Sequence, residues 1–191
     1  VVQALAHALV RTGQNDKARP HAEDAAAMAR ELGDVADEGQ AVHVLGLVAA
    51  SEGRTDKAVT ALYEAGQIAV KTGDLPEVAG AYMHLWRTLV EAGRAAEVVD
   101  LLLAFVPTAP EGPTPPSLMG SMGAGALHQL GRWDEADRLL GDPGAAHEAG
   151  GLTAVTRTLV SGALAVDKGD HDLARSLLAA AGKLAGLRLL G

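Results

Sequence analysis

Hydrophobic positions along the chain recur at the spacing of an α-helix. One stretch places Val42, Leu45, Gly46 and Ala49 at i, i+3, i+4 and i+7, and a similar stripe runs through residues 58–69. This spacing puts apolar side chains on one helical face, whereas a half-buried strand would alternate apolar and polar residues. Over the whole chain the pattern predicts an all-α fold with helices at 1–12, 16–32, 35–52, 56–72, 76–92, 95–106, 116–130, 133–140, 152–168 and 171–189.

The predicted helices belong to an internal repeat marked by glycine. The marker residues, called junction glycines below, follow one another at steps of 40, 40, 38 and 38 and are Gly13, Gly53, Gly93, Gly131 and Gly169. Each is followed five residues later by a small residue, and four of the five are preceded by one seven residues earlier. A second signal, Gly-Asp at 33–34 and 73–74, also recurs after 40 residues. Because glycine suits the left-handed conformation that ends a helix, each period is predicted to hold helix A, a tight turn, helix B and a short loop.

The repeat divides the chain into five helix pairs, at about 1–33, 34–73, 74–112, 113–150 and 151–191. Small residues where helices A and B cross allow their axes to approach toward the close end of the usual range of about 8–10 Å. Pairs of this kind stack into an α-α superhelix, in which each repeat contacts mainly its neighbours. We therefore expect a single superhelical domain over 1–191. After Gly53, Thr55 and Asp56 are the expected N-cap residues of helix B.

The spacing from each junction glycine to the small residues that follow it resembles the tetratricopeptide repeat. The matching pieces are Leu45-Gly46, Gly53, Ala58 and Ala65 in the second repeat, and Leu5-Ala6, Gly13, Ala18 and Ala25 in the first. The fifth repeat matches with Gly162, Gly169, Ala174 and Ala181. The third and fourth repeats depart from it, with Trp86, Phe105 and Pro143 in place of small residues. The period also exceeds the 34 residues of that family.

The longer period resembles the helical-repeat regions of large bacterial LuxR-type, ATP-dependent transcription regulators. Segments in that style are ALHQLGRWDEADRLL and ASEGRTDKAVTALYEAGQIAVKTGD. This resemblance implies a sensor or interaction domain, with nucleotide-binding and DNA-binding parts elsewhere in the parent chain. The apolar ends of the sequence also suggest a piece of a longer protein.

One segment interrupts the repeat. Five prolines fall within 107–116 and predict a rigid extended loop, because proline removes amide donors and prevents helix continuation. This loop is either a hinge between the third and fourth repeats or a plain long connection. A second break, Gly141-Asp142-Pro143-Gly144, shortens helix B of the fourth repeat.

Composition narrows the classes of function. The chain has 38 alanines but only one Phe, which favours helices packed through small side chains. Without cysteine it cannot form a disulfide scaffold or a thiolate zinc site. Its net charge of −8 argues against direct contact with nucleic acid, which normally requires a basic surface. No run of apolar residues approaches the length of a membrane span, so a cytoplasmic location and no membrane contact are expected.

Catalytic and metal-binding motifs are missing from the sequence. The run Gly120-Ser121-Met122-Gly123 lacks the lysine of a phosphate loop, and its glycines are interpreted as close helix packing. Asp170-His171-Asp172 is interpreted as an N-cap and first-turn acids rather than a metal site. We expect no enzyme, no cofactor and no metal. An enzyme would need two of His7, His43, His84 and His128 to converge with a carboxylate in a deep pocket.

The resemblance places a ligand groove on the A helices, at about 13, 10, 6, 3 and 2 residues before each junction glycine. In the first three repeats these positions hold Gln3, His7, Arg11, Gln40, His43, Leu47, Ser51, Met83, Arg87 and Glu91. In the last two they hold Ser121, His128, Gln129, Thr156, Leu159 and Asp167. Such a surface could recognise a peptide or small acidic ligand by arginine–carboxylate pairing and amide hydrogen bonds. A merely solvated inner face is the alternative.

Two functions of the binding class follow. The first is a sensor or interaction module of a bacterial transcription regulator, whose groove binds a peptide, protein segment or small effector and changes contacts with neighbouring domains. The second is a free-standing adaptor or scaffold that assembles proteins. Exposed superhelix ends would also allow self-association with a second copy.

Overall fold

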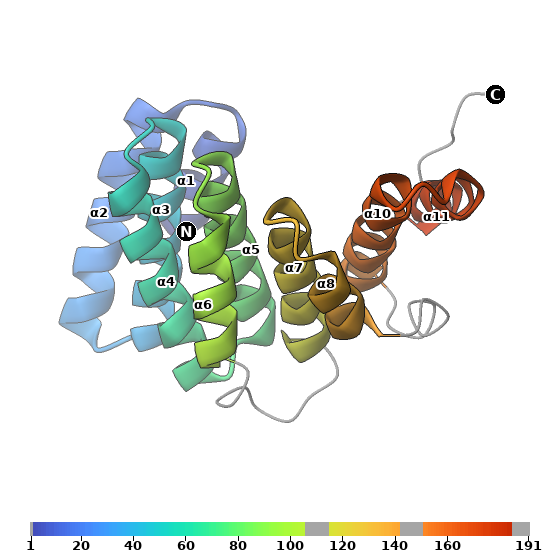
Figure 1. Ribbon diagram of the computed structural model, residues 1–191. Coiled ribbons are helices and arrows are strands. Elements are labelled where there is room, and N and C mark those ends of the chain that lie inside the picture. The colour runs from blue at the N-terminus through green and yellow to red at the C-terminus, as the bar shows by residue number, and fades with distance from the viewer. Residues whose placement is uncertain (1, 106–114, 142–150, 185–191) are drawn as a thin grey trace. The chain divides into compact units, whose positions relative to one another are not determined.

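The computed structural model describes residues 2–105, 115–141 and 151–184, and all ten of their regular elements are α-helices. They form two compact units (Figure 1). The first unit, residues 1–93, contains α1 (Val2–Arg11), α2 (Asn15–Leu32), α3 (Val35–Ser51), α4 (Thr55–Thr72) and α5 (Leu75–Glu91). The second, residues 94–191, contains α6 (Ala95–Phe105), α7 (Pro115–Gln129), α8 (Trp133–Leu140), α10 (Gly151–Asp167) and α11 (His171–Leu184).

Consecutive helices pack against each other within each unit, as an α-α superhelix requires. In the first unit α3 contacts its chain neighbours α2 and α4 and also the next A helices on either side, α1 and α5. In the second unit α7 packs on α6, α8 and α10, and α10 packs on α11. The predicted all-α repeat fold is therefore confirmed. None of the helices within the described ranges is long and apolar enough to cross a membrane.

The described helix boundaries agree with the predicted ones to within one residue. The expected extension of the last helix to 189 falls outside the described residues, as do 107–114 of the proline-rich segment and the break at 142–144. Pro115 and Pro116 occupy the first positions of α7, where an amide hydrogen would have no helical acceptor. The boundary between the two units falls at Gly93, inside the third predicted repeat.

Left-handed glycines set the period. All five junction glycines have φ between 71° and 79°, and Gly33 and Gly73 have φ of 69° and 73°. A side chain is strained in this conformation, so glycine is the residue that turns the chain from one helix to the next. At Gly33 the following amide, Asp34 N–H, donates to the carbonyl of Ala29 at 2.9 Å and closes the helix end. The predicted role of these glycines is confirmed.

The N-cap residues differ from one connection to another. Before each A helix that follows Gly-Asp, the aspartate caps: Asp34 accepts from Asp37 N–H at 3.0 Å and Asp74 from Glu77 N–H at 3.1 Å. Before α4 the prediction was wrong. Arg54 holds the N-cap position and makes no capping bond with its side chain, while Thr55 is already helical. The turn at Gly53 leaves one residue before the helix, so turn length overrides the capping preference of Thr55.

Small residues permit the close crossing of helices A and B. A Cβ atom at Gly46 of α3 would lie 2.8 Å from Leu62 Cγ and 3.2 Å from the Leu62 backbone nitrogen of α4. At the equivalent Gly162 of α10, a Cβ atom would lie 3.3 Å from Leu178 of α11. Leu62 is fully buried, so it has little room to yield. The interpretation of these positions as crossing points is supported by this geometry.

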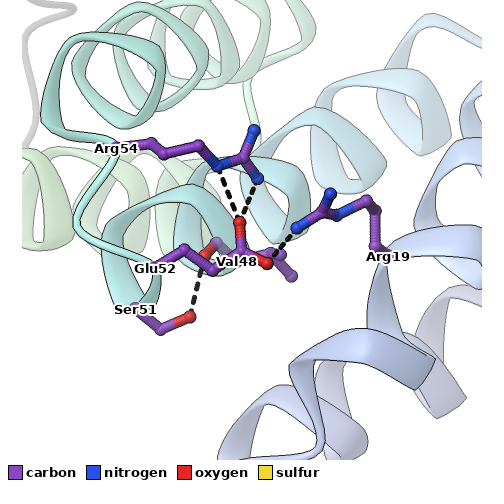
Figure 2. Close-up of polar contacts among 5 residues, drawn as sticks. All are labelled: Arg19, Val48, Ser51, Glu52 and Arg54. Atoms are coloured by element: carbon purple, nitrogen blue, oxygen red, sulfur yellow. Dashed lines mark hydrogen bonds and ion pairs between the residues drawn. The ribbon is translucent and has the colours of Figure 1, made fainter.

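Arginine side chains reinforce the turns between helices A and B. Arg94 donates to Glu97, and Arg132 to Glu135, each three residues further along the helix. Arg54 has Lys57 at that position, so it turns back to Glu52 on the other side of the turn, with Nε 2.7 Å from Oε2. Figure 2 shows the Glu52 carboxylate lying between Arg54 and Arg19 of α2. Although partial burial opposes ionisation of Glu52, the hydrogen bond from Arg54 and the charges of both arginines lower its pKa.

The Arg19–Glu52 ion pair has a counterpart with its charges reversed. Arg19 lies six residues after one junction glycine, and Glu52 lies one residue before the next. In the second unit the same two positions hold Asp137 and Lys168, which also form an ion pair. At the two intervening junctions the equivalent residues are uncharged: Val59 with Ala92, and Val99 with Leu130. An ion pair thus joins these two positions at two of the four junctions, and uncharged residues occupy them at the other two.

Gly46→Ala should destabilise the chain. The added methyl group overlaps Leu62, and overpacking costs about 1–3 kcal/mol, while better helix propensity returns up to about 1 kcal/mol. We expect a net loss of about 1–2 kcal/mol in the free energy of unfolding, measured in urea. Gly120→Ala is the matched control, because its Cβ would meet only Leu139 O at 3.9 Å. Equal effects of the two substitutions would contradict the close crossing.

Reversing one charge of the Asp137–Lys168 ion pair should lower the free energy of unfolding more than reversing both charges. Asp137→Lys places two cations together and should lower the free energy of unfolding by about 0.5–1 kcal/mol. The double change Asp137→Lys with Lys168→Asp reproduces the charge order of Arg19 and Glu52 and should restore most of that loss. A double-mutant cycle in low and high salt measures the coupling, and additive effects would mean that the pair contributes nothing.

Candidate functional site

Two histidines and a carboxylate form a hydrogen-bonded chain between α3 and α5. His43 Nδ1 lies 2.6 Å from Glu77 Oε1, and His43 Nε2 lies 2.8 Å from His84 Nδ1. His43 is 4% exposed, and Glu77 and His84 are partly buried. A third ring, His7 of α1, stands edge-on to His43 with the ring centroids 6.5 Å apart. These four residues are called the histidine cluster below, and three A helices contribute to it.

Local sequence explains how the cluster is assembled. Glu77 and His84 are seven residues apart on α5 and therefore lie on one face of the helix. Asp74 fixes the start of α5 by capping it, and the same residue accepts a hydrogen bond from Gln40 Nε2 at 3.3 Å. Gln40 and His43 are three apart on α3, as Asp74 and Glu77 are on α5. The contacts Gln40–Asp74 and His43–Glu77 therefore lie one after the other between α3 and α5, and they are called the polar rungs below.

Burial keeps His84 neutral. Loss of solvent is the largest cause, and the charges of His43, Arg87 and His7 add to it, so that the pKa of His84 falls to about 4. The Glu77 carboxylate acts in the opposite direction but is outweighed. At neutral pH the His84 ring carries no charge, and its Nε2 is not hydrogen-bonded within the part of the chain that the structure describes.

The predicted groove positions of the first unit occupy different environments. Gln40 and His43 join the polar rungs, Leu47 is buried, and Met83 is half-buried. Arg11, His7 and Arg87 are exposed. Ser51 is also exposed, and its hydroxyl donates to Val48 O of its own helix at 2.7 Å (Figure 2). The side chain of Gln3 lies outside the described residues. The cluster thus brings together His7 and His43 among the predicted residues.

The predicted positions of the second unit form a separate set. Ser121 is 2% exposed, whereas Gln129 is exposed. His128 Nε2 of α7 lies 2.5 Å from Asp167 Oδ2 at the end of α10, which joins two predicted positions of neighbouring repeats. Of the remaining positions, Thr156 is half-buried and Leu159 is exposed. Whether any of these side chains contacts a ligand remains a prediction.

The groove prediction did not include Glu77 or His84. His43 lies ten residues before Gly53, and the equivalent position of the next repeat is Met83, so His84 lies one residue beyond the predicted position. The signal that could have found both is their spacing of seven on one helix, which places a carboxylate and an imidazole on the same face. Asp170 and Asp172 match their predicted roles: Asp170 caps α11 through Leu173 N–H at 3.0 Å, and Asp172 pairs with Arg175.

The histidine cluster meets one condition of an acid–base enzyme only in part, since His43 contacts the Glu77 carboxylate whereas His84 is hydrogen-bonded to His43. A general base works best when its pKa is near the operating pH. His84, with a pKa of about 4, is a weak base for that task. In the described segments, no group of three histidines and carboxylates has the arrangement of a metal site. The chemistry that the cluster does offer is a neutral, oriented hydrogen-bonding group.

Neither models of known protein families nor curated protein sequences match this chain. The relation to tetratricopeptide repeats and to transcription regulators accordingly remains a prediction from the repeat.

Acidification should destabilise the chain through His84. Its pKa is about 4 in the folded state against about 6.5 in an unfolded chain, so between these pH values the unfolded state binds more protons. The free energy of unfolding should therefore decrease as pH falls from 6.5 to 4. His84 contributes a difference of up to one bound proton between the unfolded and folded states to this slope. Urea unfolding as a function of pH measures it. His84→Gln should reduce the slope, whereas His171→Gln, at an exposed histidine outside the cluster, serves as the control; equal slopes would contradict the assignment.

Proposed function

We propose that this chain is a non-catalytic binding and regulatory repeat domain, a sensor or interaction module of a bacterial transcription regulator. Its A helices would bind a peptide, a protein segment or a small effector. The observation that supports this most is the histidine cluster, which gathers polar groups from α1, α3 and α5. Burying polar groups is costly unless they are hydrogen-bonded, and a polar cluster held in this way offers a ligand fixed hydrogen-bonding positions.

The Arg87 cation next to the cluster suggests the charge of the ligand. Arg87 is 54% exposed on α5, one turn after His84, and its nearest carboxylate, Glu91, lies 3.8 Å from Nε. That distance is too long for a hydrogen bond, so the guanidinium fork is not engaged by this neighbour. Guanidinium groups pair with carboxylates in a bidentate manner, which would suit an acidic ligand.

Peptide selection tests the binding function. A phage-displayed library of random linear peptides is selected on residues 1–191, and the enriched peptides are synthesised and measured by fluorescence anisotropy. Arg87→Glu should weaken their binding at least about ten-fold, because a hydrogen bond to a charged group contributes about 1.5–3 kcal/mol and the substitution adds repulsion of an acidic ligand. Lys71→Glu on α4 applies the same charge change at an exposed residue of a B helix.

His43→Ala provides a second variant within the cluster, with circular dichroism as the check on folding. Unchanged affinity in both Arg87→Glu and His43→Ala would eliminate the A-helix face as the binding surface. The regulator assignment has its own test. The parent gene should encode a nucleotide-binding domain before this segment and a helix-turn-helix domain after it, and a gene lacking both would contradict the assignment.

A further inference from the structure

The hydrogen-bonded chain in the histidine cluster has a direction. An ionised carboxylate only accepts hydrogen bonds, so Glu77 requires the proton of His43 on Nδ1. When His43 is neutral, its Nε2 carries no proton and accepts from the proton on Nδ1 of His84. The remaining ring nitrogen of His84, Nε2, consequently presents a lone pair. Glu77 thus selects the Nδ1–H tautomer of His84 through His43, although it does not contact His84 itself.

Arg87 supplies the complementary group. It follows His84 by three residues on α5, and side chains at this spacing are neighbours on a helix surface. Its charge acts on His84 strongly enough to contribute to the lowered pKa of that residue. The two residues therefore offer a hydrogen-bond acceptor, His84 Nε2, and a cationic donor, the Arg87 guanidinium, within one turn of α5, and the charge of His7 of α1 also acts on His84.

This pair of groups distinguishes among acidic ligands. A simple carboxylate can use Arg87, but its oxygens meet only a lone pair at His84 Nε2. A carboxylate that carries an O–H or N–H group beside it can use both. We propose, building on the proposed binding function, that His84 and Arg87 form a site for such acids, with the carboxylate on Arg87 and the neighbouring donor on His84 Nε2. Small hydroxy acids and N-acylated amino acids share this chemistry.

Three small probes test the donor requirement at pH 7. L-Lactate has a hydroxyl group and N-acetylglycine an amide N–H beside the carboxylate, whereas propionate has neither. Titrations of the chain with labelled histidine and arginine side chains are followed by NMR. Lactate or N-acetylglycine should bind at least about five-fold more tightly than propionate, the value of one added hydrogen bond, and should shift the His84 Nε2 resonance. The tighter of the two identifies the source, a hydroxy acid or an acylated amino acid.

Two variants separate the contributions of the groups. Arg87→Gln should abolish binding of all three probes, while Lys71→Gln should leave it unchanged. Glu77→Gln removes the obligatory acceptor at the start of the hydrogen-bonded chain, so it should reduce the preference for lactate over propionate and leave propionate binding intact. The unliganded wild-type chain gives an independent readout, because long-range ring ¹⁵N spectra report the tautomer of each histidine. A His84 in the Nε2–H tautomer would overturn the proposal.

The outcomes distinguish this site from the broader binding function. Selected peptides that lose affinity in Arg87→Glu, together with equal affinities for lactate and propionate, would overturn the donor site and leave the binding function standing. A donor preference at His84 without any selected peptide would support the site and restrict its ligands to small acids. The absence of both selected peptides and a donor preference would refute the donor site and the binding function together.

Discussion

The close crossing of helices A and B is the constraint on which the rest of the structure depends. Where α3 meets α4, Gly46 leaves no room beyond its own backbone against the buried Leu62. That approach fixes the two helices of a pair relative to each other, and the left-handed Gly53 allows the chain to turn within three residues between them. Helix A of the next repeat then packs on the same pair. The polar rungs between α3 and α5 form only because this stacking brings their faces together.

Much of the fold could be predicted from sequence because its determinants are local. A glycine with positive φ and a stripe of small residues are visible in the chain, and they located the helix ends to within one residue. The N-cap of α4 was missed because turn length decided between Arg54 and Thr55, and propensity alone carries no information about turn length. Glu77 and His84 were missed as groove residues for another reason, although His84 was one of the four histidines considered for an enzyme. Which face of α5 meets α3 depends on the packing of two helices whose contacting residues are 34 to 41 positions apart.

The histidine cluster shows how a repeat fold can assemble a polar site from residues that are not part of a repeated motif. None of its members recurs at the equivalent positions of every repeat. Met83, for example, occupies the position in the third repeat that His43 occupies in the second. The scaffold is repetitive, whereas the polar groups are distributed over α1, α3 and α5. In the proposed site the partly buried Glu77 carboxylate orients the His84 ring through His43, so that the charged group and the neutral hydrogen-bonding group are different residues. The low pKa of His84, about 4, counts against its use as a general base but keeps the ring neutral for hydrogen bonding.

The two ion pairs of opposite charge order distinguish repeats whose backbones are alike. Arg19 faces Glu52 at one junction, and Asp137 faces Lys168 at another. If the repeats were exchanged so that the one carrying Asp137 preceded the one carrying Glu52, two carboxylates would meet. In the converse order Arg19 would face Lys168. The two ion pairs thus disfavour these particular exchanges of repeats by like-charge repulsion, whereas the two junctions with uncharged residues place no such restriction.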